Sequence, residues 1–134
     1  MNTGIIVQAR TGSSRLPSKV ILPFHNNRSI IEILLEQLKA NEHDVPVLLA
    51  TSAAADDEVL CRLAGRMGID CYRGPEQDVL GRFIMAAEKY GYNRIVRICA
   101  DNPFLDAKGT MELLDRDENP PHDYIAYRTV GDIP

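Results

Sequence analysis

Short apolar segments alternate along this chain with longer segments whose apolar residues recur at helical spacing. The short segments are rich in β-branched residues, as strands are, and cover residues 4–9, 45–50, 69–72, 95–99 and 124–127. The longer segments each carry one apolar face, as helices do, and cover residues 29–40, 56–67, 79–90 and 106–114. This alternation is typical of right-handed βαβ units. We therefore predict an α/β fold, a three-layer sandwich with a mainly parallel sheet.

The ends of the helical segments carry capping signals. Ser29 and Glu32 have the spacing of a capping box, in which each residue satisfies a backbone N–H of the other. Asp56 and Asp106 are expected to cap the helices that follow them, and Gly91 is expected to end another. A polar turn is expected at residues 25–28.

Length and charge limit the class of protein. The 134 residues fit a single domain, 1–134, with a net charge of −4 that argues against broad nucleic-acid binding. There is no apolar run of membrane-spanning length and no signal-peptide pattern, so a cytoplasmic protein without a membrane partner is expected. Cys61, Cys71 and Cys99 are odd in number and match no zinc spacing, which favours reduced, mostly buried thiols.

The segment after the first predicted strand concentrates anion-binding groups. Arg10, Arg15 and Lys19 surround Gly12 and two adjacent hydroxyl residues, Ser13 and Ser14. Backbone N–H groups freed by a Gly/Ser turn, together with converging Arg and Lys side chains, form an anion cradle, and a polyphosphate suits so many donors. The alternative is a charged surface loop; the position after the first strand of an α/β pattern favours the cradle.

This loop is neither of the two common phosphate-binding motifs. Counted from Gly12, a Walker P-loop requires glycine and lysine where this chain has Pro17 and Ser18. A dinucleotide fingerprint requires further glycines.

Ligands of parallel sheets bind beyond the carboxyl ends of the strands, where residues 8–19, 51–52 and 101 are expected to converge. Asp101 follows an apolar strand, and a carboxylate there, facing a triphosphate, suits Mg²⁺; the alternative is an Asp that caps a turn. Residues 56–58 are acidic, and charges at a helix N-terminus are favoured over a metal site. For residues 73–75, and for Asp78 with Arg82, a ligand-facing position and a solvated loop both stay open.

Several motifs together resemble the CTP-dependent sugar-acid nucleotidyltransferases, or cytidylyltransferases. Residues 6–20, which read IVQARTGSSRLPSKV, are similar to the opening signature of this family, in particular of its spore-coat polysaccharide biosynthesis protein F branch. The wider family includes acylneuraminate and 3-deoxy-manno-octulosonate cytidylyltransferases. The resemblance continues in order through residues 50–57, 73–74, 78–83 and 96–106, and covers about residues 4–128.

The resemblance implies a Rossmann-like nucleotide-diphospho-sugar transferase fold and transfer of CMP from CTP to a sugar acid with release of pyrophosphate. It implies catalytic roles for Arg10, Arg15 and Lys19 on the triphosphate, and Mg²⁺ on Asp101. The nucleotide-binding residues that we expect are Gln8, Ala9, Arg10, Gly12, Ser13, Ser14, Arg15, Lys19, Thr51, Ser52, Asp78 and Arg82. CTP and a sugar acid are the expected partners, and the full-length protein is expected to form a homodimer.

Two departures from the family pattern qualify the resemblance. Ala100 stands where a glycine usually precedes the metal-binding Asp. Family members extend well beyond residue 134, and residues 131–134 do not resemble a natural end, so a truncated domain lacking its C-terminal portion is expected.

Two other functions stay open. A glycosyltransferase of related fold would usually carry an Asp-x-Asp metal motif, which Asp101-Asn102-Pro103 lacks. A non-catalytic nucleotide-binding fragment would bind CTP without turnover.

Overall fold

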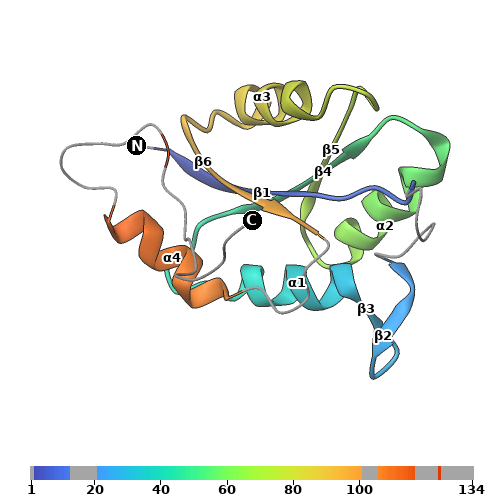
Figure 1. Ribbon diagram of the computed structural model, residues 1–134, viewed down its shortest axis with the longest axis horizontal. Helices are drawn as coiled ribbons and strands as arrows, with labels where there is room; N and C mark the ends of the chain where they lie inside the picture. The colour runs from blue at the N-terminus through green and yellow to red at the C-terminus, as the bar shows by residue number, and fades with distance from the viewer. Residues whose placement is uncertain (1, 13–20, 101–105, 117–123, 125–134) are drawn as a thin grey trace, which may run out of the picture.

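A four-stranded parallel sheet forms the centre of the computed structural model, which describes residues 2–12, 21–100, 106–116 and 124 (Figure 1). The strands lie in the order β5-β4-β1-β6 and every neighbouring pair is parallel. Their bounds are β1 (Thr3–Gln8), β4 (Val47–Ser52), β5 (Asp70–Gly74) and β6 (Arg94–Cys99). The prediction of four of the five strands and of a parallel sheet is therefore confirmed. The fifth predicted strand, 124–127, lies outside the described residues except for Tyr124, which is exposed and not in a strand.

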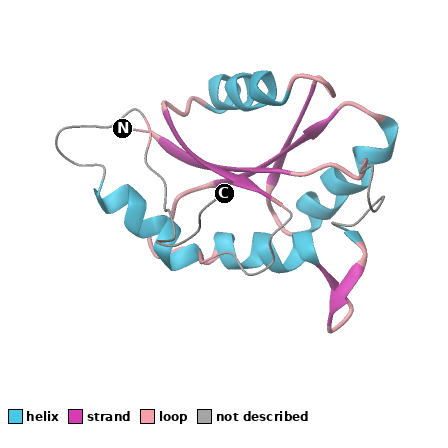
Figure 2. Ribbon diagram, viewed as in Figure 1, coloured by secondary structure: helices cyan, strands magenta, loops and turns pink. Residues whose placement is uncertain are grey.

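Helices cover both faces of this sheet. Helix α3 lies on one face, and α1, α2 and α4 lie on the other (Figures 1 and 2). The bounds are α1 (Ile30–Lys39), α2 (Glu58–Arg66), α3 (Val79–Tyr90) and α4 (Ala107–Arg116). The predicted three-layer α/β architecture is confirmed.

Alternation along the central strands divides the core in two. Ile5 and Val7 pack with the apolar faces of α1, α2 and α4, whereas Ile6 packs with Phe83 and Ala86 of α3. Successive strand side chains point to opposite faces, so a strand buried on both faces is apolar throughout. This is why residues 5–7 form a continuous apolar run.

Most helix ends follow the predicted signals. Ser29 and Glu32 form the capping box at the start of α1, and Gly91 ends α3 with a φ of 72°, a left-handed conformation that favours glycine. The Asp106 carboxylate accepts a hydrogen bond from the Gly109 N–H at 2.9 Å, at the start of α4.

The prediction that Asp56 caps α2 is wrong. A 3₁₀ turn, η2 (Ala55–Asp57), precedes the helix, and Asp57 occupies the capping position without making a side-chain cap hydrogen bond. The Asp57 carboxylate is instead directed to the segments that follow β1 and β4.

A small hairpin follows the segment after β1. Strands β2 (Pro23–His25) and β3 (Arg28–Ser29) pair in an antiparallel manner. Asn26 and Asn27 make the turn with φ values of 51° and 61°. The polar turn at residues 25–28 is confirmed, but its flanking strands were missed because they are short and lack alternation.

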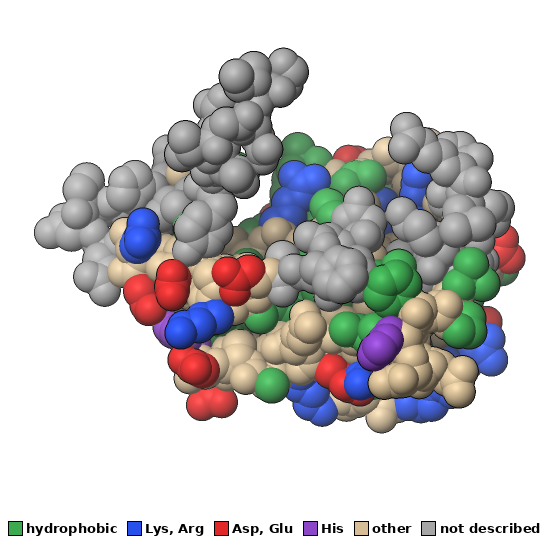
Figure 3. All heavy atoms as spheres, turned by 60° about the horizontal axis from the view of Figure 1, so that its bottom comes forward, with side chains coloured by type: hydrophobic (Ala, Val, Ile, Leu, Met, Phe, Trp, Pro, Cys, Tyr) green, Lys and Arg blue, Asp and Glu red, His purple; other side chains and the backbone are tan. Residues whose placement is uncertain are grey.

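Within the described residues, no helix is long and apolar enough to cross a membrane. On the face that Figure 3 turns forward, acidic and basic side chains are interspersed over the described part of the surface.

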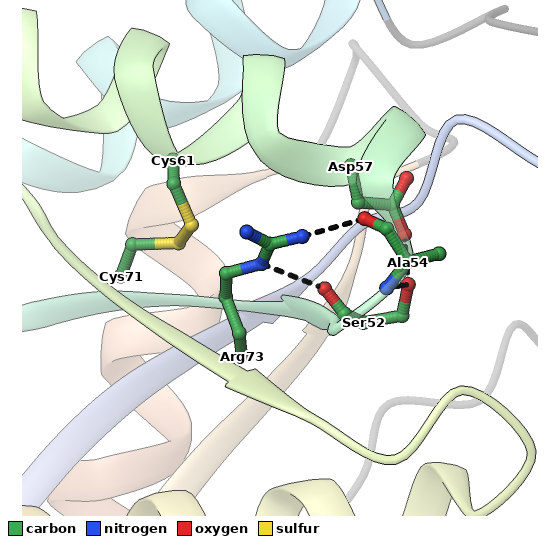
Figure 4. The surroundings of a disulfide bond; sticks show 6 residues. All are labelled: Ser52, Ala54, Asp57, Cys61, Cys71 and Arg73. Carbon is green, nitrogen blue, oxygen red and sulfur yellow. Dashed lines mark hydrogen bonds between the residues drawn. A yellow bond between two sulfur atoms is a disulfide. The ribbon is translucent and has the colours of Figure 1, made fainter.

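A disulfide joins Cys61 of α2 to Cys71 of β5, which corrects the prediction of reduced thiols (Figure 4). Because α2 packs directly on β5, the two Cα atoms lie 5.4 Å apart, within the range that a disulfide spans. Sequence spacing could not reveal this tertiary contact. Cys99 is free and exposed, so the expectation of mostly buried thiols is also wrong.

Candidate functional site

The carboxyl ends of all four strands meet at one edge of the sheet. Gln8, the last residue of β1, pairs with Ala50 of β4 and Cys99 of β6, and Ser52 of β4 pairs with Gly74 of β5. The Ala100 N–H donates to the Gln8 carbonyl at 3.0 Å and extends this edge past β6. The predicted convergence is confirmed for residues 8–12 and 51–52. Ser13, Ser14, Arg15, Lys19 and Asp101 lie outside the described residues, so their roles stay predictions.

A buried carboxylate, that of Asp57, holds the segments after β1 and β4 together. Its Oδ1 accepts hydrogen bonds from the backbone N–H and from the hydroxyl of Thr11, both at 2.7 Å. Its Oδ2 accepts a hydrogen bond from the Ser52 hydroxyl. Asp57 is 3% exposed. Burial alone would raise the pKa of this carboxyl, but the hydrogen bonds from Ser52 and Thr11 outweigh burial, and the pKa lies below its ordinary value. Asp57 is therefore a buried anion near neutral pH.

Arg73 braces the loop that carries Asp57. Its Nε donates to the Ser52 carbonyl at 3.0 Å and its terminal nitrogen donates to the Ala54 carbonyl at 2.5 Å. The Ser52 hydroxyl in turn accepts from the Ala54 N–H at 3.1 Å. Figure 4 shows Arg73 reaching from β5 between the disulfide and this loop. Arg73 is thus bonded within the protein, Pro75 is exposed, and a ligand-facing position for residues 73–75 stays a prediction.

Arg82, in the first turn of α3, is a buried cation. It is 0% exposed, and none of its three guanidinium nitrogens makes a hydrogen bond within the structure described. Burial lowers the pKa of the Arg82 guanidinium and the neighbouring positive charge of Arg10 lowers it further, whereas Asp57 and Asp78 act in the opposite direction. A guanidinium remains charged at neutral pH even so, because its ordinary pKa is very high.

The stem of Arg82 fits against the end of β5 because Gly74 has no side chain. A Cβ atom at Gly74 would stand 2.7 Å from Arg82 Cγ, too close for two carbon atoms. Buried guanidinium groups are normally satisfied by acceptors, so three nitrogens without a hydrogen bond to the described residues indicate a ligand with several acceptor atoms.

The other predicted nucleotide-binding residues take different positions at this edge. The Gln8 side-chain oxygen is buried and has no hydrogen-bond partner within the described residues, and Ala9 is buried beside it. Arg10 and Gly12 are exposed at the start of the loop. Thr51 is fully buried. Asp78 is exposed and caps α3 by accepting from the Gly81 N–H at 2.8 Å.

The sequence interpretation missed the link between Thr11 and Asp57. The available signal was a hydroxyl residue after each of two neighbouring parallel strands, with an acidic residue shortly after the second. The acidic residues 56–58 belong to no group that could hold a metal ion, and in the described segments no such group of His, Cys, Asp or Glu occurs. The preference for helix-terminal charges over a metal site at 56–58 stays a prediction, and Asp57 is more than a helix-terminal charge because its carboxylate is bonded to Thr11 and Ser52.

Comparison with known proteins agrees with the fold and the opening motif. The family model described as cytidylyltransferase matches residues 4–131. An uncharacterized protein from Methanocaldococcus jannaschii is 41% identical over 111 residues, which are 83% of this chain and 44% of that protein. The spore coat polysaccharide biosynthesis protein SpsF from Bacillus subtilis is 36% identical over 115 residues, which are 82% of this chain and 45% of that protein.

Two solved structures share the architecture. A cytidylyltransferase from Leptospira borgpetersenii serovar Hardjo-bovis superposes with a TM-score of 0.81 at 34% identity, covering 87% of this chain and 48% of that one. A CMP:2-keto-3-deoxy-manno-octonic acid synthetase complexed with CTP gives a TM-score of 0.73 at 19% identity, over 87% of this chain and 47% of that one, and shows the fold alone.

The chain thus spans a little under half the length of these relatives. The family model matches nearly all of the chain, in agreement with the motifs in the first loop and with the parallel sheet that carries it. On these grounds, the chain belongs to the cytidylyltransferase family.

Proposed function

We propose that this chain binds CTP at the carboxyl edge of the sheet, and that the protein transfers CMP from CTP to a sugar acid with release of pyrophosphate. Family membership supports a CTP-using nucleotidyltransferase. Among proteins of this fold, the solved synthetase complexed with CTP makes a CMP-linked sugar acid. The similarity to a spore coat polysaccharide biosynthesis protein supports a sugar destined for a surface polysaccharide.

The buried Arg82 guanidinium is the observation that carries the proposal. Its nitrogens have no partner in the described structure, and Arg10 adds a second positive charge nearby. Two converging cations at the carboxyl edge of a parallel sheet suit an anionic nucleotide. The buried Gln8 side-chain oxygen, also without a partner, offers an acceptor for an N–H group of the nucleotide.

The proposed chemistry is mainly positioning and neutralisation of charge. A hydroxyl oxygen of the sugar acid attacks the α-phosphorus in line, a new phosphorus–oxygen bond forms, the bond to the β-phosphate oxygen breaks, and the hydroxyl proton is released. In this scheme Arg10, Arg15 and Lys19 hold the triphosphate and stabilise the departing pyrophosphate. Gln8, Ala9 and Thr51 frame the base and ribose.

Mg²⁺ is proposed as the cofactor, where it would neutralise charge on the phosphates. Asp57 is not a suitable ligand, because donors from Thr11 and Ser52 occupy both of its oxygens. Asp101, which directly follows Ala100 at the carboxyl edge, is the carboxylate that we assign to the ion. Mg²⁺ usually takes one or two carboxylates, with phosphate and water completing its shell.

A nucleotide-binding module without turnover is the second candidate function. The chain matches 44–48% of the length of the relatives compared above, and binding of CTP without release of pyrophosphate would distinguish this module from the transferase. The homodimer expected from the family resemblance stays a prediction in either case.

Thermal unfolding with a panel of nucleoside triphosphates, each with Mg²⁺, tests the proposal first. A ligand that binds only the folded chain raises its melting temperature, so CTP should raise it more than ATP, GTP or UTP do. Release of pyrophosphate from CTP in the presence of sugar acids then separates transfer from binding. The same rise with all four nucleotides would contradict the specificity for cytosine, and no rise with any would contradict the function.

The role of Arg82 is tested by calorimetry with CTP and Mg²⁺. We expect Arg82→Gln to weaken binding by about tenfold or more, since hydrogen bonds to charged groups contribute about 1.5–3 kcal/mol each. Arg66→Gln makes the same change of charge at an exposed position on α2 and serves as the control. Equal affinity of Arg82→Gln and Arg66→Gln would remove the observation on which the proposal depends.

A further inference from the structure

Asp57 joins three separate parts of the carboxyl edge through one side chain. It begins α2, it accepts two hydrogen bonds from Thr11 in the loop after β1, and it accepts one from Ser52 at the end of β4. Thr11 and Ser52 are themselves 5% and 0% exposed, so water does not compete for these bonds. Three donors on one buried carboxylate fix its orientation and theirs.

Simpler roles for Asp57 do not fit its contacts. It makes no side-chain hydrogen bond to the first turn of α2, so it does not act as an ordinary helix cap. No ion pair of Asp57 with Lys, Arg or His occurs within the described residues, so the charge is not held there to neutralise a neighbouring cation by direct contact. It accepts its hydrogen bonds instead from Thr11, which lies between Arg10 and Gly12, and from Ser52 at the end of β4.

We propose that Asp57 is a positioning residue, which sets the start of the phosphate-binding loop and thereby the affinity for the nucleotide triphosphate. This inference rests on the proposed function. Thr11 lies between Arg10, whose guanidinium is near that of Arg82, and Gly12, which opens the rest of the loop. Two bonds from Thr11 to one oxygen fix both the backbone and the side chain at this point. The loop therefore leaves β1 in one direction before any ligand arrives, which lowers the ordering cost of binding.

Asp57→Asn, with Asp56→Asn as a matched control, tests this role. Each variant removes one negative charge, and the two residues are adjacent, but Asp56 is exposed whereas Asp57 is buried and bonded. Loss of a negative charge near a cationic site should by itself strengthen binding of a triphosphate. Loss of positioning should weaken it, so the two explanations predict opposite signs.

We expect calorimetry with CTP and Mg²⁺ to give a dissociation constant about tenfold higher for Asp57→Asn and changed less than about twofold for Asp56→Asn. Where turnover is measurable, the KM for CTP should rise more than kcat falls. Unchanged or tighter binding by a folded Asp57→Asn variant overturns the proposal. A wild-type chain that binds no nucleoside triphosphate overturns the proposed function and this role with it, so the two failures are distinguishable.

A second pair of variants decides the question if Asp57→Asn does not fold. Thr11→Val removes one of the two bonds to Asp57 with little change of shape, and Thr11→Ser keeps it. We expect weaker CTP binding by Thr11→Val and recovery to near the wild-type value by Thr11→Ser; equal binding by the two overturns the proposal. Amide hydrogen exchange at position 11 can be measured without nucleotide. We expect the protection of this amide from exchange to be lower in Thr11→Val than in Thr11→Ser.

Discussion

The two edges of the sheet differ in how their polar groups are satisfied. At the amino edge, the Asn2 N–H donates to the Asn93 side chain at 2.9 Å, its amide donates to the Gly91 carbonyl at 2.6 Å, and its carbonyl accepts from Asn93 and Arg94. At the carboxyl edge, the Arg82 nitrogens and the Gln8 side-chain oxygen are buried without partners in the described structure. The polar groups of Asn2 at the amino edge are bonded within the protein, whereas among the described residues the carboxyl edge presents donors and an acceptor for a ligand to satisfy.

Positively charged side chains gather at the carboxyl edge of the sheet. The chain carries a net charge of −4, yet Arg10, Arg73 and Arg82 gather at the carboxyl edge around one fully bonded carboxylate, that of Asp57. Because Asp57 is occupied by Thr11 and Ser52, it orders the edge without forming a direct ion pair with these cations. An unneutralised buried charge lowers the stability of the free protein. Binding of an anion restores that stability.

The largest expected effect comes from the loop lysine and arginine. Lys19→Ala or Arg15→Ala should reduce pyrophosphate release by about 100-fold or more, because each removes a cation from the developing charge of the transition state. The free energy of unfolding should change by less than about 0.5 kcal/mol, because these cations are expected to act on the ligand. Turnover assays and denaturant unfolding measure the two quantities, and Lys108→Ala at an exposed position on α4 is the control. Loss of stability without loss of turnover would assign these cations to the fold instead.

Removal of the disulfide tests the role of α2, which carries Asp57 at its start and Cys61 one turn later. A bond that closes a loop of 10 residues contributes about 2–3 kcal/mol to stability through the unfolded chain. Cys61→Ser should therefore lower the free energy of unfolding by that amount, measured in urea. CTP affinity should change less than about twofold, since Asp57 is held by Thr11 and Ser52. A large loss of affinity would show that the carboxyl edge depends on the disulfide.

Arg82→Met and Asn2→Ala should change stability in opposite directions. Methionine retains an apolar stem beside Gly74 and removes three unsatisfied donors, so unfolding should become harder by about 1–2 kcal/mol while CTP binding is lost. Asn2→Ala removes the hydrogen bond from the Asn2 side-chain amide to the Gly91 carbonyl, so unfolding should become easier by about 1 kcal/mol with CTP binding unchanged. Urea unfolding and calorimetry measure both. Destabilisation by Arg82→Met would mean that the guanidinium has partners in the free protein.

The sequence predicted the layers of this fold because its strands and helices carry strong periodic signals. Residues 5–7 are apolar on both faces of a strand, and Ser29 with Glu32 marks a helix start through local chemistry alone. The edge at which a ligand would bind followed from one rule, the position of parallel strand ends. Arg82 was among the predicted residues through family resemblance, but its burial without partners is a tertiary property.

Contacts between distant segments could not be predicted in this way. Cys61 and Cys71 pair because α2 packs on β5, and Asp57 reaches Thr11 across 46 positions of sequence. The acidic run at 56–58 is typical of a helix N-terminus, and nothing local distinguishes exposed Asp56 from buried Asp57. The two residues differ because the 3₁₀ turn η2 directs one side chain into the edge and leaves the other in solvent.

The smallest expected effect is a dependence of stability on acid pH that belongs to Asp57. Its pKa in the folded chain is below the value near 4 that an unfolded Asp has, so the ionised form favours folding. This contribution is complete above pH ~5 and is lost as the pH falls through ~4 towards the lower pKa of the folded state. The difference in unfolding free energy between wild type and Asp57→Asn should therefore be constant from pH 7 to ~5 and shrink below ~4, by at most about 1.4 kcal/mol per pH unit. Urea unfolding across this range measures it, with Asp56→Asn at the exposed neighbouring position as the control variant. A difference that is independent of pH would mean that folding does not change the pKa of Asp57, and would contradict the inference that its hydrogen bonds stabilise the ionised form.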